Sequence, residues 1–268
     1  MRHIFTLLFA LWLIPAAVVG ADKEAVTYQK KDSVTVCRLL AASRQLPRGT
    51  NLQLFFARKF LGLPYVAHTL EINDDERLVV NTRQLDCTTL VENVTALTLC
   101  AQRGQYTWRD YLRTLTAMRY RNGKITDYTS RIHYFTEWIT ANTKEGIVTE
   151  IQSPNPPFSA VQQVSVSFMS NHPKSYKALR NHPEYVADIK KMEQQVSGQR
   201  FRYIPKTAVR NHSQLRKAVK DGDIVYVITN LAELGSPKLR DVAGGGRPTT
   251  QEPQQPTPPK EGEDGAQK

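Results

Sequence analysis

The stretch LDCTTLVENV, at residues 85–94, places a cysteine where its sulfur could act as a nucleophile. Asp86 has the position of a helix N-cap, whose side chain accepts hydrogen bonds from free backbone N–H groups. Cys87 then lies in the first turn of a helix predicted for residues 86–100, where the helix dipole and the free N–H groups favour a thiolate. A small buried residue is the other interpretation, since free cysteines are often buried.

The spacing of apolar residues predicts this helix and the elements around it. Leu90, Val94 and Leu97 recur at the spacing of one helix face. Further helices are predicted by the same spacing at 33–45, 51–61, 108–118, 130–140 and 211–220. Strands or extended segments are predicted by alternating or β-branched runs at 76–80, 164–169, 201–205 and 223–229.

The two ends of the chain differ from its middle. A short basic start, the apolar run Ile4–Ile14 and small residues at 19–21 together predict a signal peptide over residues 1–21. Residues 236–268 are rich in Pro, Gly, Gln and Glu and contain no aromatic residue, which predicts a disordered tail. Residues 22–235 are then expected to form one domain.

The formal net charge of +11 falls almost entirely on this domain, because the charges of the tail balance. Basic surfaces attract nucleic acid, acidic membranes or anionic polymers. Export disfavours nucleic acid and leaves the anionic cell envelope. We therefore expect a periplasmic protein with no nucleic-acid partner and no stable membrane insertion after signal cleavage. Solubility alone is the alternative explanation of the charge.

The three cysteines, Cys37, Cys87 and Cys100, leave at least one thiol unpaired. Cys87 and Cys100 are too far apart along one helix to form a disulfide, and a bond between Cys37 and Cys100 stays open. His172 and His182 have no cluster of other metal ligands near them in the sequence. We therefore expect no metal and no other cofactor.

Six segments of the chain carry a resemblance to a known family. They are FLGLPYVAHTLE (60–71), LVVNTRQLDCTTLVENVTALTLC (78–100), SRIHYFTEWI (130–139), SFMSNHPKSY (167–176), YIPK (203–206) and DGDIVYVITN (221–230). In this order they resemble the N-acetylmuramoyl-L-alanine amidase-like branch of the NlpC-type cysteine peptidases, long catalogued as a domain of unknown function, and the resemblance runs from about residue 33 to residue 235. The resemblance implies an α+β, papain-like core in which the helix bearing Cys87 packs against an antiparallel sheet. It also implies cleavage of the amide between muramic acid and L-alanine in peptidoglycan fragments, including anhydro-muropeptides.

The resemblance also implies roles for single residues. Cys87 would be the nucleophile that forms a thioester, and its own backbone N–H would help to stabilise the oxyanion. Tyr65 matches a tyrosine that such enzymes keep close to the cysteine, although an ordinary core aromatic also fits. Arg131, His133 and Tyr134 match a motif that would face the substrate; an aromatic helix that packs the core is the alternative.

The catalytic histidine of the family has no match in this sequence. The family carries it on a strand shortly after the GDIV segment, whereas residues 213–268 contain no histidine. We therefore expect a sheet truncated at the C-terminus, through a reading-frame shift or a natural truncation, and negligible amidase activity. Loss of a general base typically costs roughly 10²–10⁴ in rate. His68 and Glu71 are weaker site candidates. No spacing suggests that another histidine replaces the missing base, whether His68, His133, His172, His182 or His212.

Two other functions fit the same sequence. A non-catalytic protein that binds muropeptides or the cell wall would keep the substrate groove without turnover. A basic, envelope-associated structural protein would bind intact cell wall through its charge, independently of Cys87.

Overall fold

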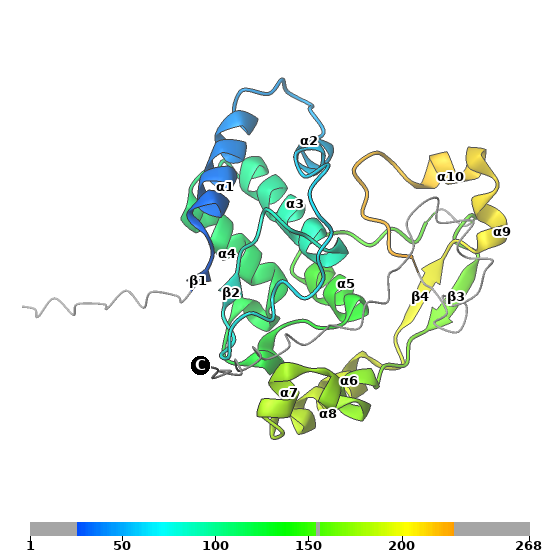
Figure 1. Cartoon of the computed structure of the whole chain (residues 1–268). Helices are drawn as coiled ribbons and strands as arrows, with labels where there is room; N and C mark the ends of the chain where they lie inside the picture. Colours follow the sequence, from blue (N-terminus) through cyan, green and yellow to red (C-terminus); the bar gives the residue numbers. More distant parts are fainter. Residues whose placement is uncertain (1–25, 154–155, 228–268) are drawn as a thin grey trace, which may run out of the picture. The chain divides into compact units, whose positions relative to one another are not determined.

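The computed structural model of the chain describes residues 26–153 and 156–227 (Figure 1). The chain divides into two compact units, residues 1–223 and 224–268, and every described helix and strand belongs to the first. The predicted signal peptide and the predicted tail lie outside the described residues. In chain order the elements are β1 (Val26–Thr27), α1 (Lys30–Ser43), α2 (Leu52–Arg58), β2 (Leu78–Val79), α3 (Cys87–Gln102), α4 (Trp108–Arg119), η1 (Arg121–Gly123), η2 (Tyr128–Ser130), α5 (Phe135–Lys144), β3 (Ala160–Gln163), α6 (Phe168–Asn171), η3 (Pro173–Ser175), α7 (Lys177–Asn181), α8 (Tyr185–Val196), β4 (Arg200–Tyr203), α9 (Lys206–Val209) and α10 (His212–Ala218).

The described part is a mostly helical α+β structure with two small sheets. Strands β1 and β2 are parallel, with Val26 opposite Leu78. Strands β3 and β4 are antiparallel, with Ala160 opposite Tyr203. Each sheet has two strands among the described residues, so helix packing supplies most of the buried surface. No helix in the described ranges has the length and apolar character needed to cross a membrane.

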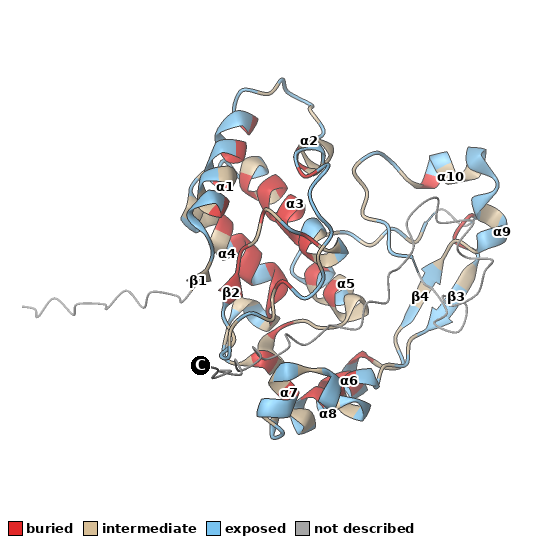
Figure 2. Ribbon diagram, viewed as in Figure 1, coloured by how far each residue is buried: buried red, intermediate tan, exposed pale blue. Residues whose placement is uncertain are grey.

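Helix α3 lies within a hydrophobic core and packs mainly against α4, α2 and α1. Its residues from 92 to 98 are all buried (Figure 2). The neighbouring helices contribute Leu40 from α1, Phe56 from α2 and Leu115 from α4, each with no exposed surface. Burial of one such side chain is worth about 1.5–3 kcal/mol. The helix that carries Cys87 is therefore rigidly supported along most of its length.

A second cluster of buried apolar residues joins α6, α7 and α8 to η2. Leu179, Ile189, Met192 and Val196 form its centre, and Met169 of α6 packs on them. The Glu193 carboxylate, 2% exposed, lies beside this cluster and accepts hydrogen bonds from the backbone N–H groups of α6. Polar and apolar contacts thus fix the short helices together.

Three sequence predictions need correction. The prediction of a strand at 164–169 is wrong, because the observed strand, β3, covers residues 160–163. The N–H groups of Met169 and Ser170 donate to the Glu193 carboxylate and not to a neighbouring strand. Residues 223–227 belong to neither sheet; a β-branched run needs a partner surface to become a strand. Residues 228–229 of that prediction lie outside the described part.

The helix predicted at 130–140 begins later, at Phe135. Arg131 is extended because its backbone pairs with Tyr120 and because the Ile132 N–H donates to the Arg119 carbonyl at 2.9 Å. The three candidate site residues Arg131, His133 and Tyr134 therefore belong to the segment that enters α5 and not to the helix itself.

Candidate functional site

Two anchors position the chain just before Cys87. The buried Asp32 carboxylate accepts hydrogen bonds from the Thr82 N–H and the Thr82 hydroxyl, both at 2.9 Å. Asp86 caps α3 by accepting from the Thr89 N–H at 2.8 Å, while the Thr89 hydroxyl accepts from the Asp86 N–H at 2.9 Å. The N-cap predicted at Asp86 is confirmed, and Cys87 is the first residue of the helix.

The Cys87 side chain is exposed, so the interpretation of Cys87 as a buried core residue is wrong. Leu90, one turn along the helix from Cys87, is 36% exposed although it belongs to the predicted apolar face. Val94 and Leu97 of that predicted face are buried. Thr89 and residues 92–98 are buried, whereas the face that bears Cys87 and Leu90 is open among the described residues.

The first turn of α3 also leaves hydrogen-bond donors free. Among the described residues, the backbone N–H groups of Cys87 and Thr88 donate to no protein acceptor. Such groups at a helix start carry partial positive charge and suit an anionic partner. Two donors beside an exposed sulfur could therefore stabilise the negative oxygen that forms when the sulfur attacks a carbonyl.

The Tyr65 phenol lies beside the Cys87 thiol. Residues 64–66 pair with Leu85 through backbone hydrogen bonds of 3.1 and 3.2 Å, which brings Tyr65 to the start of α3. The Tyr65 hydroxyl is in hydrogen-bonding contact with Cys87, although the side chain is 72% exposed. Partial burial of the phenol and the negative charges of Cys87 and Asp86 raise the pKa of Tyr65. The phenol therefore stays protonated at neutral pH and can donate.

Arg131 lies in a buried charged cluster. Its Nη2 donates to Glu71 Oε1 at 2.5 Å, its Nε lies 3.6 Å from Glu76 Oε1, and its guanidinium lies 5.0 Å from the centre of the Tyr128 ring. Burial opposes the charge of Arg131, but Glu76 and Glu71 outweigh burial and raise its pKa. The charge is thus neutralised inside the protein.

His133 and Tyr134 also bond to protein groups. The His133 Nε2 lies 2.8 Å from the Tyr128 carbonyl, so the neutral ring carries its proton on Nε2. Burial of the ring and the charge of Arg131 lower the pKa of His133 well below 6.5, against the opposing effect of this hydrogen bond. The Tyr134 hydroxyl donates to Glu193 at 2.6 Å, and burial, followed by that carboxylate, raises the pKa of Tyr134.

The structure therefore brings Cys87 and Tyr65 together but does not bond them to the other three candidate residues. Within residues 26–153 and 156–227, no hydrogen bond or ion pair joins Cys87 or Tyr65 to Arg131, His133 or Tyr134. The substrate-binding roles of the three stay predictions. Their observed bonds are those of a cluster that holds α5, η2 and α8 in place.

No described histidine forms a hydrogen bond with the Cys87 sulfur. His133 bonds to Tyr128, His172 Nδ1 lies 3.1 Å from the Phe168 carbonyl, and His182 Nδ1 lies 3.1 Å from a Glu184 carboxylate oxygen. His68, the weaker candidate, is exposed and has a left-handed backbone with φ of 61°. The thiol lacks a histidine partner in the described part of the chain.

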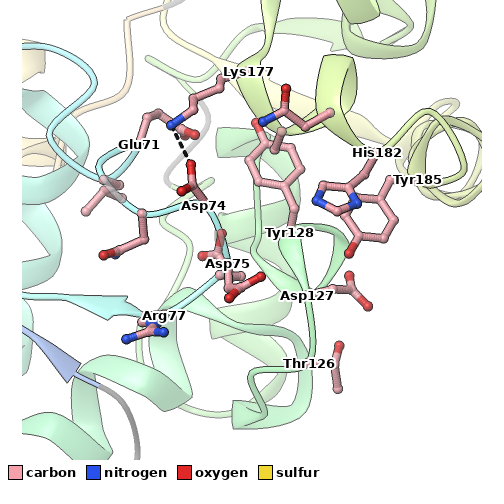
Figure 3. Close-up of a pocket in the computed structure, with 15 residues that line it drawn as sticks. Glu71, Asp74, Asp75, Arg77, Thr126, Asp127, Tyr128, Lys177, His182 and Tyr185 are labelled. Atoms are coloured by element: carbon pink, nitrogen blue, oxygen red, sulfur yellow. Dashed lines mark hydrogen bonds and ion pairs between the residues drawn. The ribbon is translucent and has the colours of Figure 1, made fainter.

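The described residues also form an acidic cavity of about 200 Å³ (Figure 3). Glu71, Asp74, Asp75 and Asp127 are among its lining residues, and Lys177 pairs with Asp74 at 2.8 Å. The five predicted site residues are not among the described residues that line it. Nor do three or more His, Cys, Asp or Glu side chains of the described ranges come together as a metal site.

Sequence reasoning did not single out Glu76 or Glu193, the carboxylates that hold Arg131 and Tyr134. Tyr134 and Glu193 are 59 residues apart, and Arg131 and Glu71 are 60 residues apart. No local motif connects such pairs. In the sequence, Glu76 and Glu193 look like any acidic residue beside an apolar run, and that pattern is too common to identify the partner of a buried side chain.

Solved structures similar to this chain include three from different organisms. A crystal structure of an N-acetylmuramoyl-L-alanine amidase from Bacteroides uniformis is 42% identical, with a TM-score of 0.54, over 59% of this chain and 65% of that one. A protein from Bacteroides fragilis is 42% identical, with a TM-score of 0.53, over 57% of this chain and 66% of that one. A DUF1460 protein from Legionella pneumophila is 18% identical, with a TM-score of 0.50, over 67% and 64%, and supports the fold alone.

The chain thus spans slightly less than two thirds of the length of these structures. Among curated proteins, none is similar enough to count as a match. The family model described as "AmiA-like: N-acetylmuramoyl-L-alanine amidase-like" matches residues 55–242, which include Tyr65, Cys87 and the whole of α3. On this match, the chain belongs to the AmiA-like, N-acetylmuramoyl-L-alanine amidase-like family.

Proposed function

We propose that the chain is, by descent, an NlpC-type amidase of peptidoglycan fragments, with Cys87 as the nucleophile toward the N-acetylmuramoyl-L-alanine bond. The single observation that carries this proposal is the exposed Cys87 at the start of α3 in a chain of this family, beside two N–H groups that donate to no acceptor in the described part of the chain. The 42% identity to the Bacteroides uniformis amidase supports the substrate class.

In the proposed reaction the Cys87 thiolate attacks the carbonyl carbon of the muramoyl amide. The Cys87 and Thr88 N–H groups stabilise the oxyanion, and Tyr65 donates a hydrogen bond to the thiolate in the free site. The C–N bond then breaks, the stem peptide leaves through the amino group of its L-alanine after that nitrogen takes up a proton, and a muramoyl thioester remains. Water hydrolyses the thioester and regenerates the thiol.

Turnover by the chain as written is proposed to be negligible. The leaving amine needs a proton donor and the hydrolytic water needs a base, and a histidine serves both steps in this class. No described histidine bonds to Cys87, and residues 213–268 contain none. A non-catalytic muropeptide-binding protein is the second candidate function, because the exposed Cys87 and Tyr65 surface remains available to a ligand.

The finer fold and location belong to the same proposal. A papain-like arrangement would place an antiparallel sheet over the open α3 face that bears Cys87 and Leu90. Residues 1–21 would direct export to the periplasm, residues 22–235 would form the amidase-like domain, and residues 236–268 would be a disordered tail. Cell fractionation of the full chain, with sequencing of its N-terminus, tests the export step.

The function is tested by incubating the full chain with an anhydro-muropeptide and following free stem peptide by mass spectrometry. Cys87→Ala is the test variant, and Cys37→Ala, also at an exposed cysteine, is its matched control. We expect turnover at least about 100-fold below that of an active family member. Residual turnover should vanish in Cys87→Ala and persist in Cys37→Ala; equal turnover in both variants would remove Cys87 from the chemistry.

Calorimetry with the same muropeptide separates the two candidate functions. Binding without measurable turnover favours the non-catalytic protein. Fast turnover that depends on Cys87 would show that the chain finds a proton shuttle despite its missing histidine. Absence of both binding and turnover would reject the muropeptide assignment.

A further inference from the structure

The segment formed by β4, α9 and α10 carries a continuous run of positive charge. Residues 200–220 contain seven basic residues and no Asp or Glu. All seven are exposed. They are Arg200 and Arg202 on β4, Lys206 and Arg210 on α9 and its C-cap, and Arg216, Lys217 and Lys220 on α10 and just after it. We call these seven side chains, together with β3, the basic surface.

Six of the seven cations lack a carboxylate partner among the described residues. Apart from Lys206, none of the seven forms an ion pair with another described residue. By contrast, Arg83, Arg119, Arg121 and Arg131 each pair with a carboxylate. The paired strand β3 adds Ala, Val and two Gln, and so contributes no charge.

Strand pairing gathers part of this charge on one face. Arg200 and Arg202 are exposed and alternate with the half-buried Phe201 and Tyr203. Across the ladder Val161 is opposite Arg202, and it is 42% exposed. Helix α9 follows β4 after two residues and contacts α10, so these three elements are neighbours along the chain and in space (Figure 1).

Apolar side chains lie exposed between these cations. Val161 on β3 and Val209 on α9 are 42% and 44% exposed. Anionic lipid headgroups attract clusters of four to eight Lys or Arg residues, and adjoining apolar side chains gain free energy by entering the headgroup region. A soluble polyanion would use the cations but gain nothing from the valines.

From these observations we propose that the basic surface docks the protein on an anionic lipid bilayer, with the cations on headgroup phosphates and Val161 and Val209 at the acyl boundary. The docking is peripheral and reversible, since it needs no membrane-spanning helix. It is independent of the amidase chemistry, because none of its residues contacts Cys87 or Tyr65 among the described interactions.

The test is co-sedimentation of the full chain with vesicles of mixed phosphatidylglycerol and phosphatidylcholine, and with vesicles of phosphatidylcholine alone. We expect binding only to the anionic vesicles. Raising the salt concentration from about 0.1 M to about 0.5 M should weaken binding by at least about 10-fold, because headgroup attraction is screened. Failure to bind anionic vesicles at low salt would reject the proposal without any variant.

Matched variants locate the surface. Changing Arg200, Arg202, Arg216 and Lys217 to Gln should weaken vesicle binding by at least about 50-fold. The control changes four exposed cations of the N-terminal region, Lys30, Lys31, Arg38 and Arg48, to Gln and removes the same charge. It should weaken binding by less than about 5-fold. Equal losses in both variants would mean that net charge alone, and not this surface, causes binding. Circular dichroism and thermal unfolding verify that each variant is folded.

The two valines distinguish a bilayer from a soluble polyanion. Val161→Ser combined with Val209→Ser should weaken vesicle binding by about 5-fold to 10-fold and leave binding to heparin unchanged. If the protein binds heparin or double-stranded DNA through the four substituted cations but not vesicles, its partner is a soluble polyanion and the bilayer proposal fails.

Discussion

Cys87 and Tyr65 are positioned by backbone pairing and a helix cap, and their side chains are exposed. Arg131, His133 and Tyr134 are instead held by their own side chains, in bonds to Glu71, the Tyr128 carbonyl and Glu193. Buried charge is costly unless it is paired, so the second group must be complete for the protein to fold. Cys87 and Tyr65 bury little surface, so the stability of the fold depends much less on their side chains.

A sequence motif can therefore mark residues that support the fold or residues that remain available to a ligand. The residues around Arg131 support the fold because their side chains bond to other groups of the protein. The residues around Cys87 offer groups to a ligand: a thiol outside any disulfide, an exposed phenol and, counting described acceptors only, two N–H groups without an acceptor. Such groups at a well-positioned helix start indicate a ligand or a reaction, and the two regions can be compared by substitution.

The largest expected effect is on stability at Arg131. Arg131→Met leaves Glu71 and Glu76 without their cationic partner, and loss of one member of a buried ion pair costs about 3–5 kcal/mol. Cys87→Ala should change the free energy of unfolding by no more than about 0.5 kcal/mol. Urea unfolding followed by circular dichroism measures both, and similar values would erase the contrast between the two regions.

A smaller loss is expected at Tyr134. Tyr134→Phe removes the donor to Glu193 Oε1, whose partner oxygen Oε2 is already buried without a hydrogen bond among the described residues. The expected cost is about 1–2 kcal/mol in the free energy of unfolding. The matched change Tyr65→Phe, at an exposed phenol, should cost less than about 0.5 kcal/mol. A larger loss of unfolding free energy for Tyr65→Phe than for Tyr134→Phe would mean that Tyr65, and not Tyr134, supports the fold.

His133 should make stability depend on pH. Its pKa in the folded protein is well below the usual 6.5, so below pH 6.5 the unfolded chain binds a proton that the folded protein does not. The free energy of unfolding should therefore fall with decreasing pH, by at most about 1.4 kcal/mol per pH unit from this group. Urea unfolding at several pH values should show a smaller slope for His133→Gln, whereas the control at exposed His172, His172→Gln, keeps the full slope.

The smallest expected effect concerns thiol reactivity. In the folded protein Cys87 and Cys37 should be alkylated by iodoacetamide, whereas Cys100, which is buried and bonded to Thr114 at 3.4 Å, should react only after unfolding. Tyr65→Phe removes a hydrogen bond to the Cys87 sulfur and should change its alkylation rate by about 2-fold to 5-fold. Peptide mass spectrometry measures the rates, with Cys37 as the internal reference. An unchanged rate at Cys87 would mean that Tyr65 does not act on the thiol.

Sequence could predict the parts of this molecule that depend on neighbouring residues. The start of α3 follows from Asp86 and Thr89, which are three residues apart and bond to each other. The exposure of Cys87 and Leu90 could not be predicted from the sequence. Helical spacing shows which residues share a helix face, but it does not show whether another helix or strand covers that face. Likewise the segment 164–169 alternates like a strand, but a distant carboxylate, Glu193, takes up the backbone donors of its last residue and the next.

The cap of α3 has a consequence for how such a protein can be changed. Asp86 and Thr89, three residues apart, fix the orientation of the first turn through hydrogen bonds to each other, and the pairing of Leu85 with residues 64–66 holds the chain just before it. Because the cap lies within four consecutive residues, the position of the Cys87 sulfur depends on few other parts of the chain. A histidine introduced within hydrogen-bonding reach of Cys87 would therefore meet an exposed sulfur that is already held in place.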